Sequence, residues 1–155
     1  MTQKPGAISA RVERIRAGKD PELLLAMPSG FAILGKHQPG EVRGCCMLLP
    51  DPVVASPNDL EAGARAQFFS DLCLLGDAIL EVTGAERINY LVLCNQVPEL
   101  HGHAIPRFAA EDPAKRLQGP FEAYDFGGAP IADARGSEQE LHAALRAALQ
   151  KRLAR

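Results

Sequence analysis

A long amphipathic segment constrains the fold of this chain more than any other feature. Ser56, followed by Pro57 and Asp59, has the pattern of a capping box, which satisfies free backbone N–H groups where a helix begins. Apolar residues then recur at helical spacing until Gly84 ends the run, namely Leu60, Ala64, Phe68, Leu72, Leu75 and Ile79. The pattern predicts one helix over about residues 57–82, whose apolar stripe covers one face of a sheet.

Shorter patterns surround this helix. Residues 7–17 predict a short amphipathic helix, and residues 20–27 a second one that begins at Asp20-Pro21. The apolar runs 31–34 and 45–49, separated by a Gly- and Pro-rich connection, predict two antiparallel strands of a hairpin. Prolines and glycines after residue 108 exclude long regular elements.

A last helix is predicted near the end of the chain. Ser137 and Glu140 form a second capping-box pattern, and four leucines follow at intervals of four residues: Leu141, Leu145, Leu149 and Leu153. This narrow stripe fits packing on the chain's own core or on another subunit. The pattern alone leaves both arrangements open.

Composition narrows the function class. The chain has 155 residues, of which 46% are hydrophobic, and a formal net charge of −2, which predicts one folded domain over residues 1–155. It contains neither a membrane-length apolar run, nor a signal-peptide stretch in residues 1–16, nor a basic run. We expect a cytoplasmic protein that binds neither membranes nor nucleic acid. Four cysteines without a CxxC pair predict reduced thiols, with no metal and no cofactor.

Most of the candidate functional side chains lie in residues 88–108. This segment predicts two strands, 88–94 and 100–107, joined by a short connection. Glu99, His101 and His103 alternate along the second strand, so the two-residue period places them on one face. Gly102 between the histidines indicates a β-bulge, or close approach of another backbone or a ligand. Three groups that bind or move protons on one small surface indicate a functional site, although a solvated strand face would look the same.

The same three side chains resemble a two-histidine, one-carboxylate metal set in composition. Neighbouring positions on one face of a flat strand are about 6–7 Å apart, which is too far for one ion unless the strand bends. A metal site is therefore the weaker interpretation.

The order of hairpin, long helix and strand, followed by HGHAIPR at residues 101–107, resembles the histidine triad superfamily of nucleotide hydrolases and transferases. The resemblance covers about residues 30–108. It implies an α+β fold: an antiparallel sheet of about five strands, a long helix packed on it and a C-terminal helix. It also implies a small-molecule nucleotide or phosphorylated metabolite as ligand and a homodimer with strands joined across the two-fold axis.

The resemblance assigns roles residue by residue. His101 falls at the position that attacks the α-phosphorus, His103 at the third histidine, and Glu99 where the family has its first histidine. We expect Glu99 to orient an imidazole, because a carboxylate repels phosphate. Asn95 corresponds to an asparagine that orients the catalytic strand and the phosphate. Further ligand-binding candidates, taken from residue chemistry, are Gln96, Lys36, Arg43 and Arg107. Each arginine is either a bidentate phosphate clamp or, as is commoner at a strand end, a solvated or structural charge.

Three departures from the family pattern leave two functions open. Glu99 replaces a histidine, only residues 96–98 stand where the family has a longer Gly-rich loop, and Lys36 replaces the acid that binds ribose hydroxyls. The first function is hydrolysis or transfer of a nucleotidyl group through a nucleotidyl-histidine intermediate. The second is a catalytically degenerate module of the same fold that binds a nucleotide or phosphometabolite.

Overall fold

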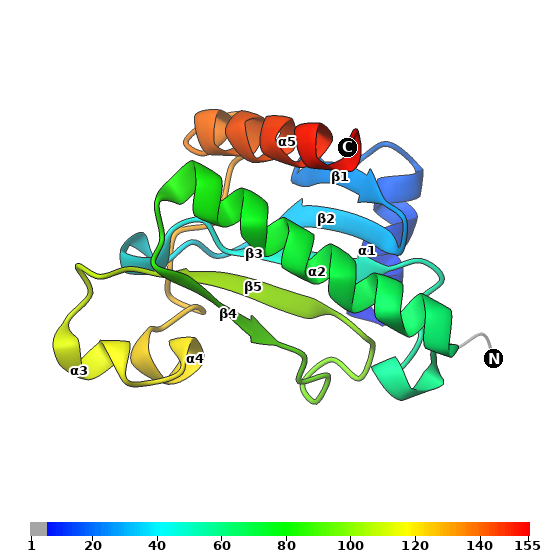
Figure 1. Ribbon diagram of the computed structural model, residues 1–155, viewed down its shortest axis with the longest axis horizontal. Coiled ribbons are helices and arrows are strands. Elements are labelled where there is room, and N and C mark those ends of the chain that lie inside the picture. Colours follow the sequence, from blue (N-terminus) through cyan, green and yellow to red (C-terminus); the bar gives the residue numbers. More distant parts are fainter. Residues whose placement is uncertain (1–5) are drawn as a thin grey trace.

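A five-stranded antiparallel sheet forms the centre of the computed structural model, which describes residues 6–155. Each strand pairs antiparallel with its neighbours in the order β1-β2-β3-β5-β4, which Figure 1 shows as a stack of arrows. The predicted α+β class with about five strands is confirmed. The strands are β1 (Leu23–Met27), β2 (Gly30–Leu34), β3 (Cys46–Pro50), β4 (Arg87–Leu91) and β5 (Gly102–Arg107).

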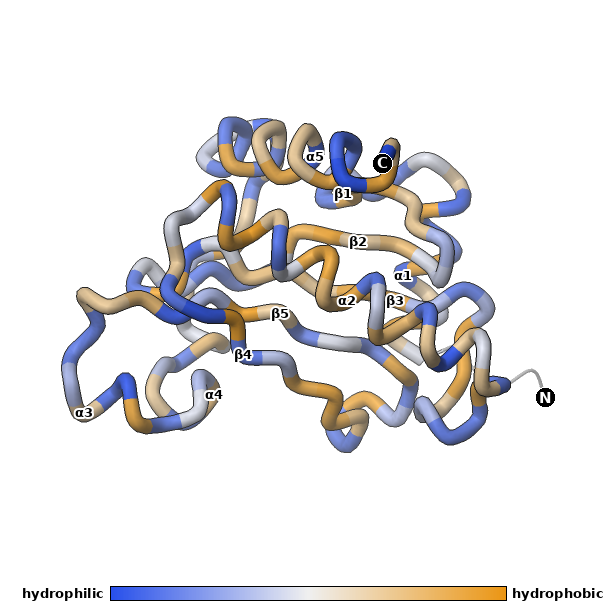
Figure 2. Tube along the Cα trace, viewed as in Figure 1, coloured by the Kyte–Doolittle hydropathy of each residue, from blue (hydrophilic) through white to orange (hydrophobic). Residues whose placement is uncertain are grey.

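Two helices cover one face of this sheet. α2 (Ala62–Thr83) crosses the strands, and α5 (Gln139–Leu153) lies beside α2 over β1 (Figure 1). In Figure 2 most of the apolar positions of α5 lie on the side of the helix toward the rest of the molecule. The helices and the sheet share one core, which includes Phe68, Leu72, Leu75, Leu145 and Leu149. No helix within residues 6–155 is both long and apolar enough to span a membrane.

The opposite face of the sheet is covered only in part. α1 (Ala7–Arg16) packs Val12 and Ile15 against Ile33 and Leu49 there. Two single-turn helices, α3 (Pro113–Arg116) and α4 (Pro120–Ala123), belong to the irregular segment predicted after residue 108. The expectation about a signal peptide falls partly on residues 1–5, which lie outside the described residues.

The alternation along β5 decides which side chains reach this second face. Gly102 lies against Leu72 of α2, and Ala104 is buried in the core that α2 covers. Ile105 packs instead with Val42 on the opposite side. Because side chains alternate along a strand, His103 shares the face of Ile105.

The predicted helix over residues 20–27 is wrong, because Leu23–Met27 forms β1. Met27 pairs with Gly30 and Leu23 with Ile33, so the segment is the first arm of a tight hairpin. A helix this short is marginal by itself, whereas pairing with β2 satisfies the backbone groups and buries Leu24 completely. Tertiary pairing overrides the local helical pattern.

The long helix begins later than predicted. The capping box is present, with Ser56 N–H donating to Asp59 Oδ2 at 3.1 Å, but it caps a 3₁₀ turn, η2 (Pro57–Asp59). Leu60 then adopts an extended backbone, and α2 starts only at Ala62. A second 3₁₀ turn, η1 (Gly40–Val42), lies between β2 and β3.

The terminal helix packs on the chain's own core. Its leucines at 141, 145 and 149 are buried against α2 and β1. The predicted capping box does not form, since α5 starts at Gln139 after Glu138. His142 Nε2 and Arg146 Nη1 each lie 2.8 Å from a β1 carbonyl oxygen, of Leu23 and Leu24 respectively. Side chains of α5 therefore cap carbonyl groups of this edge strand.

Candidate functional site

The two histidines, His101 just before β5 and His103 within it, lie next to each other. Their ring centroids are 5.1 Å apart, and the ring planes meet at 78°. Both line a cavity of about 650 Å³ together with Asn95 and Gln96. The two-residue spacing and the preceding connection thus bring four of the predicted site residues to one cavity, whose size falls within the range of small-molecule sites.

A backbone hydrogen bond sets the tautomer of His101. Its Nδ1 lies 2.7 Å from the carbonyl oxygen of Glu99. A carbonyl oxygen can only accept, so Nδ1 carries the proton, and Nε2 of the neutral ring keeps its lone pair. His101 is only 9% exposed. The ring is therefore held in one tautomer, in which Nε2 is the nitrogen with a free lone pair.

We expected the Glu99 side chain to orient a histidine ring. Its carboxylate is instead hydrogen-bonded to α1. Its Oε1 accepts from the backbone N–H of Ile8 at 3.0 Å and of Ser9 at 3.3 Å, and Oε2 accepts from the Ser9 hydroxyl. These N–H groups belong to the first turn of α1, where they have no acceptor within the helix and where the helix dipole favours a negative charge. Glu99 orients His101 through its carbonyl oxygen, while its carboxylate anchors α1.

Burial makes His103 a neutral imidazole. Desolvation, with a smaller contribution from the nearby His101, lowers the pKa of His103 to about 4. At neutral pH the ring is uncharged. It can therefore donate one N–H to a ligand oxygen but cannot supply a positive charge before a ligand binds.

Asn95 lines the cavity from a sharp turn that follows β4. β4 ends at Leu91, earlier than the predicted residue 94, and Cys94 adopts a left-handed backbone with φ of 55°. Asn95 and Gln96 follow on the exposed surface. The Leu100 N–H then donates to Val54 O at 2.7 Å, which fixes the chain just before the histidines.

Lys36 lies on the far side of His103. It follows β2 and lines an apolar slot of about 160 Å³ that also contains His103. It further lines a cavity of about 220 Å³ beside Arg11 and Arg14 of α1. Arg11 Nε pairs with Asp20 at 2.9 Å. The predicted ligand-binding lysine therefore borders the slot, not the cavity that holds Asn95.

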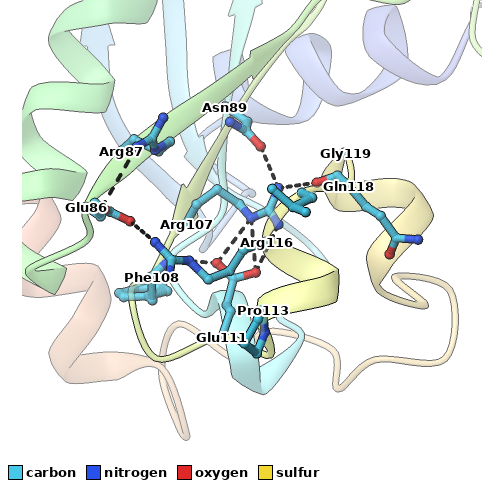
Figure 3. Close-up of a pocket in the computed structure, with 11 residues that line it drawn as sticks. Glu86, Arg87, Asn89, Arg107, Phe108, Glu111, Pro113, Arg116, Gln118 and Gly119 are labelled. Atoms are coloured by element: carbon cyan, nitrogen blue, oxygen red, sulfur yellow. Dashed lines mark hydrogen bonds and ion pairs between the residues drawn. The ribbon is translucent and has the colours of Figure 1, made fainter.

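The structure places Arg107 outside the histidine cavity. All five of its N–H donors are used, on Glu111 and Asn89 side chains and on the carbonyl oxygens of Lys115 and Gln118 (Figure 3). The side chain is almost completely buried. Figure 3 shows this network at the wall of a separate cavity of about 560 Å³, beside β4 and α3. The geometry does not support a phosphate clamp at Arg107.

The other arginine candidate is also separated from the histidines. Arg43 Nη2 pairs with Glu138 Oε2 at 2.6 Å, just before α5, and Arg43 does not line the histidine cavity. Within residues 6–155 no cluster of three or more His, Cys, Asp or Glu side chains is arranged to hold a metal ion. The Glu99 carboxylate that the metal interpretation requires is bound to α1 instead.

Comparison with solved structures decides the fold. A histidine triad protein from Bradyrhizobium japonicum superposes with a TM-score of 0.68 at 22% identity, covering 86% of this chain and 94% of its own. A hypothetical histidine triad nucleotide-binding protein from Sulfolobus tokodaii gives 0.69 at 14% identity, covering 92% of each chain. A zinc-bound histidine triad family protein from Mycobacterium smegmatis gives 0.64 at 18% identity, covering 90% and 92%. This chain has the histidine triad fold. No family model and no curated protein matches its sequence.

Within this histidine triad fold, the candidate site also includes two aromatic residues that the sequence analysis did not identify. The ring of Phe121 lies 5.1 Å from that of His103, and Phe126 lies 4.9 Å from Phe121. Both come from the irregular segment after β5, where no periodicity marks them. The available signal was compositional, because two phenylalanines stand within six residues of a chain that is only 5% aromatic.

Proposed function

We propose that this chain hydrolyses or transfers the nucleotidyl group of a dinucleoside polyphosphate or related nucleotide, acting at the α-phosphate through a nucleotidyl-histidine intermediate. The observation that carries the proposal is the 2.7 Å contact between His101 Nδ1 and Glu99 O. It leaves the lone pair of Nε2 available in a cavity large enough for a nucleotide. The fold agrees with this chemistry.

The reaction divides into two displacements. His101 Nε2 forms a bond to the α-phosphorus while the bond from phosphorus to the bridging oxygen breaks and the electron pair leaves with the second phosphate. Water or another acceptor then attacks the same phosphorus, loses its proton to solvent and releases His101. Asn95, Gln96 and the N–H of His103 line the cavity and supply hydrogen-bond donors for the phosphoryl oxygens.

The neutral state of His103 favours certain leaving groups. A pKa of about 4 means that His103 holds no second proton for a leaving group at neutral pH. A phosphate leaving group departs as an anion and needs none, whereas the amine of a phosphoramidate must be protonated. The ligand-free site is therefore better matched to dinucleoside polyphosphates and nucleotide sugars than to nucleoside phosphoramidates, and a bound anionic phosphate, which raises the pKa of His103, narrows this difference.

The test is a turnover assay on those three substrate classes, together with covalent trapping. Wild-type protein incubated with a radiolabelled dinucleoside polyphosphate and quenched in alkali, where phosphoramidates survive, should carry label on His101. Acid treatment should release the label. A protein that turns over none of the three classes and traps no label would rule out the enzymatic proposal.

A catalytically degenerate binding module is the second candidate, and the Lys36 position favours it. Lys36 borders a cavity with Arg11, Arg14 and Glu22, and both arginines already pair with Asp20. Lys36 is therefore the cation of this cavity that can take an anionic group, and it cannot accept hydrogen bonds from ribose hydroxyls. A phosphorylated metabolite bound without turnover would establish this alternative. Isothermal titration with nucleotides and sugar phosphates, run beside the turnover assay, separates the two functions.

We also propose a homodimer joined along β4. α5 side chains cap carbonyl groups of β1 at one edge of the sheet. β4 forms the other edge, and its Arg87 and Tyr90 side chains are exposed. An open edge strand offers unpaired backbone groups to a second copy. Light scattering across a range of protein concentrations should give twice the chain mass, and a monomer at every concentration would contradict the proposal.

A further inference from the structure

The cavity that holds His101 and His103 has one acidic residue in its wall and no lysine or arginine. Asp125 is the only Asp, Glu, Lys or Arg residue within residues 6–155 that lines it. Burial lowers the pKa of His103 to about 4, so that ring is uncharged at neutral pH. A phosphoryl group bound at the histidines therefore meets a carboxylate and no fixed cation, and like charges repel. Asp125 must serve another part of a nucleotide that binds here.

A tight turn holds the Asp125 carboxylate in one orientation. Its Oδ1 accepts a hydrogen bond from the Gly128 N–H at 3.0 Å, the kind of local bond that aspartate makes in turns. Within residues 6–155 the second oxygen, Oδ2, accepts no hydrogen bond. A Cβ atom at position 128 would lie 2.5 Å from Oδ2, so glycine leaves the space that this oxygen occupies. The turn leaves one acceptor oxygen of the carboxylate free for a ligand.

The backbone on both sides of Asp125 is fastened to the rest of the molecule. Tyr124 donates its hydroxyl to Glu111 Oε1 at 2.5 Å, and Tyr124 is buried. Further along, the Gln38 N–H donates to the Pro130 carbonyl oxygen at 3.0 Å. The segment that carries Asp125 is therefore ordered before a ligand binds, which lowers the entropy cost of binding a group there.

The ligand group that complements this carboxylate must donate hydrogen bonds. An ionised carboxylate only accepts, so it offers nothing to a phosphate oxygen. In a nucleotide the sugar is bonded directly to the 5′-phosphate, so the sugar hydroxyls are the donors nearest to a phosphorus at His101. Hydrogen bonds to an ionised acceptor are stronger than those between neutral groups. A site that uses such a bond discriminates against an analogue without the hydroxyl.

We propose that Asp125 is a specificity-determining residue that accepts hydrogen bonds from the sugar hydroxyls of the ligand, so that the site prefers ribonucleotides to analogues without those hydroxyls. The proposal names the substrate class of the proposed nucleotide site and rests on that function. The sugar then lies between the carboxylate and the phosphoryl group, which keeps the two negative charges apart. Asp125 takes no part in the two displacements at phosphorus.

The first experiment removes the carboxylate and the sugar hydroxyls separately. In isothermal titration, wild-type protein should bind adenosine monophosphate about tenfold more tightly than its 2′,3′-dideoxy analogue, and Asp125→Ala should reduce this ratio to about twofold or less. Affinity for inorganic phosphate should stay equal or rise, because a like charge is lost. Asp133→Ala is the matched control: Asp133 also accepts a backbone N–H, of Arg135, in an exposed turn, but it does not line the histidine cavity. An unchanged ratio in Asp125→Ala overturns the proposal.

The second experiment moves the carboxylate and keeps its charge. Gly128→Ala places a Cβ against Asp125 Oδ2, and Gly128 does not have a positive φ, so its backbone accepts alanine. The nucleotide ratio should fall toward that of Asp125→Ala, while phosphate affinity stays within about twofold because the net charge is unchanged. Gly136→Ala is the control, since its Cβ displaces the Asp133 carboxylate in the same way. A wild-type ratio in Gly128→Ala would show that Asp125 acts by charge alone and overturn the proposal.

The remaining outcomes separate this role from other uses of Asp125 and from the proposed function. The titrations contain EDTA, and a nucleotide ratio that appears only after magnesium replaces EDTA would mean that a cation bridges Asp125 and the phosphate. A lower kcat in Asp125→Ala with an unchanged ratio would make Asp125 a proton acceptor. Either result overturns the hydroxyl role. If the ratios behave as expected but wild type turns over no nucleotide, the role of Asp125 stands and the enzymatic function fails.

Discussion

Glu99 acts on His101 through its backbone and not through its side chain. The carbonyl oxygen of Glu99 accepts from His101 Nδ1 at 2.7 Å, while the carboxylate of the same residue accepts three hydrogen bonds from the start of α1. One residue thus fixes the tautomer of the candidate nucleophile and ties the N-terminal helix to the segment that carries the two histidines. The side chain and the backbone of Glu99 can be tested separately.

Replacing Glu99 with alanine should destabilise the protein and leave catalysis nearly intact. Loss of the carboxylate leaves the Ile8 and Ser9 N–H groups without their acceptor, which costs about 1–2 kcal/mol in the free energy of unfolding, measured by urea denaturation. The carbonyl remains, so kcat should stay within about threefold. The same substitution at exposed Glu122 is the control. A large loss of kcat with unchanged stability would give the carboxylate a direct catalytic role.

Replacing His101 with alanine should abolish turnover and label trapping. Affinity for adenosine monophosphate should change by less than about tenfold, because the bond to phosphorus forms only along the reaction path. His103→Ala should weaken binding and rate together, since its hydrogen bond exists in both ground and transition states. Full activity in the His101 variant would show that another group is the nucleophile.

Stability should fall in mild acid because of His103. Its pKa is about 4 in the folded protein, against an ordinary value of 6.5, so the unfolded chain binds more protons between these two pH values. Unfolding free energy is therefore lost as pH decreases from about 6.5 to 4, by on the order of 2 kcal/mol after allowance for partial exposure. His103→Gln should flatten this part of the curve of denaturant stability against pH. Identical slopes in both proteins would contradict the prediction.

Replacing Arg107 with methionine should cost about 3–5 kcal/mol in the free energy of unfolding, because the buried Glu111 carboxylate loses its partner. Thermal and denaturant melts should show this loss, whereas Arg135→Met, at an exposed side chain away from β4, should change stability by less than about 0.5 kcal/mol. A stable Arg107 variant that binds phosphate poorly would restore the clamp interpretation from the sequence.

The sequence by itself determined the elements with strong local periodicity. Leucines at helical spacing predicted both α2 and α5, and the two-residue period placed His101 and His103 on one face. These features depend on backbone geometry over a few residues, so no distant contact is needed to infer them. Boundaries were less certain, as the 3₁₀ turn after Ser56 shows, because a capping box stabilises either kind of first turn.

Only the tertiary structure decided the partners that lie far apart in the chain. Residues 23–27 form a strand because they pair with β2. The Glu99 carboxylate accepts a hydrogen bond from Ser9, which lies 90 residues earlier in the chain. Arg107 is enclosed by groups from β4 and α3, and Phe121 reaches His103 from an irregular segment. The local sequence pattern predicts on which face of its own helix or strand a side chain lies. The contacts that form between distant segments depend on how the whole chain packs around its core. Each such contact must be compatible with the burial of apolar groups and the hydrogen bonding of polar groups in the rest of the molecule.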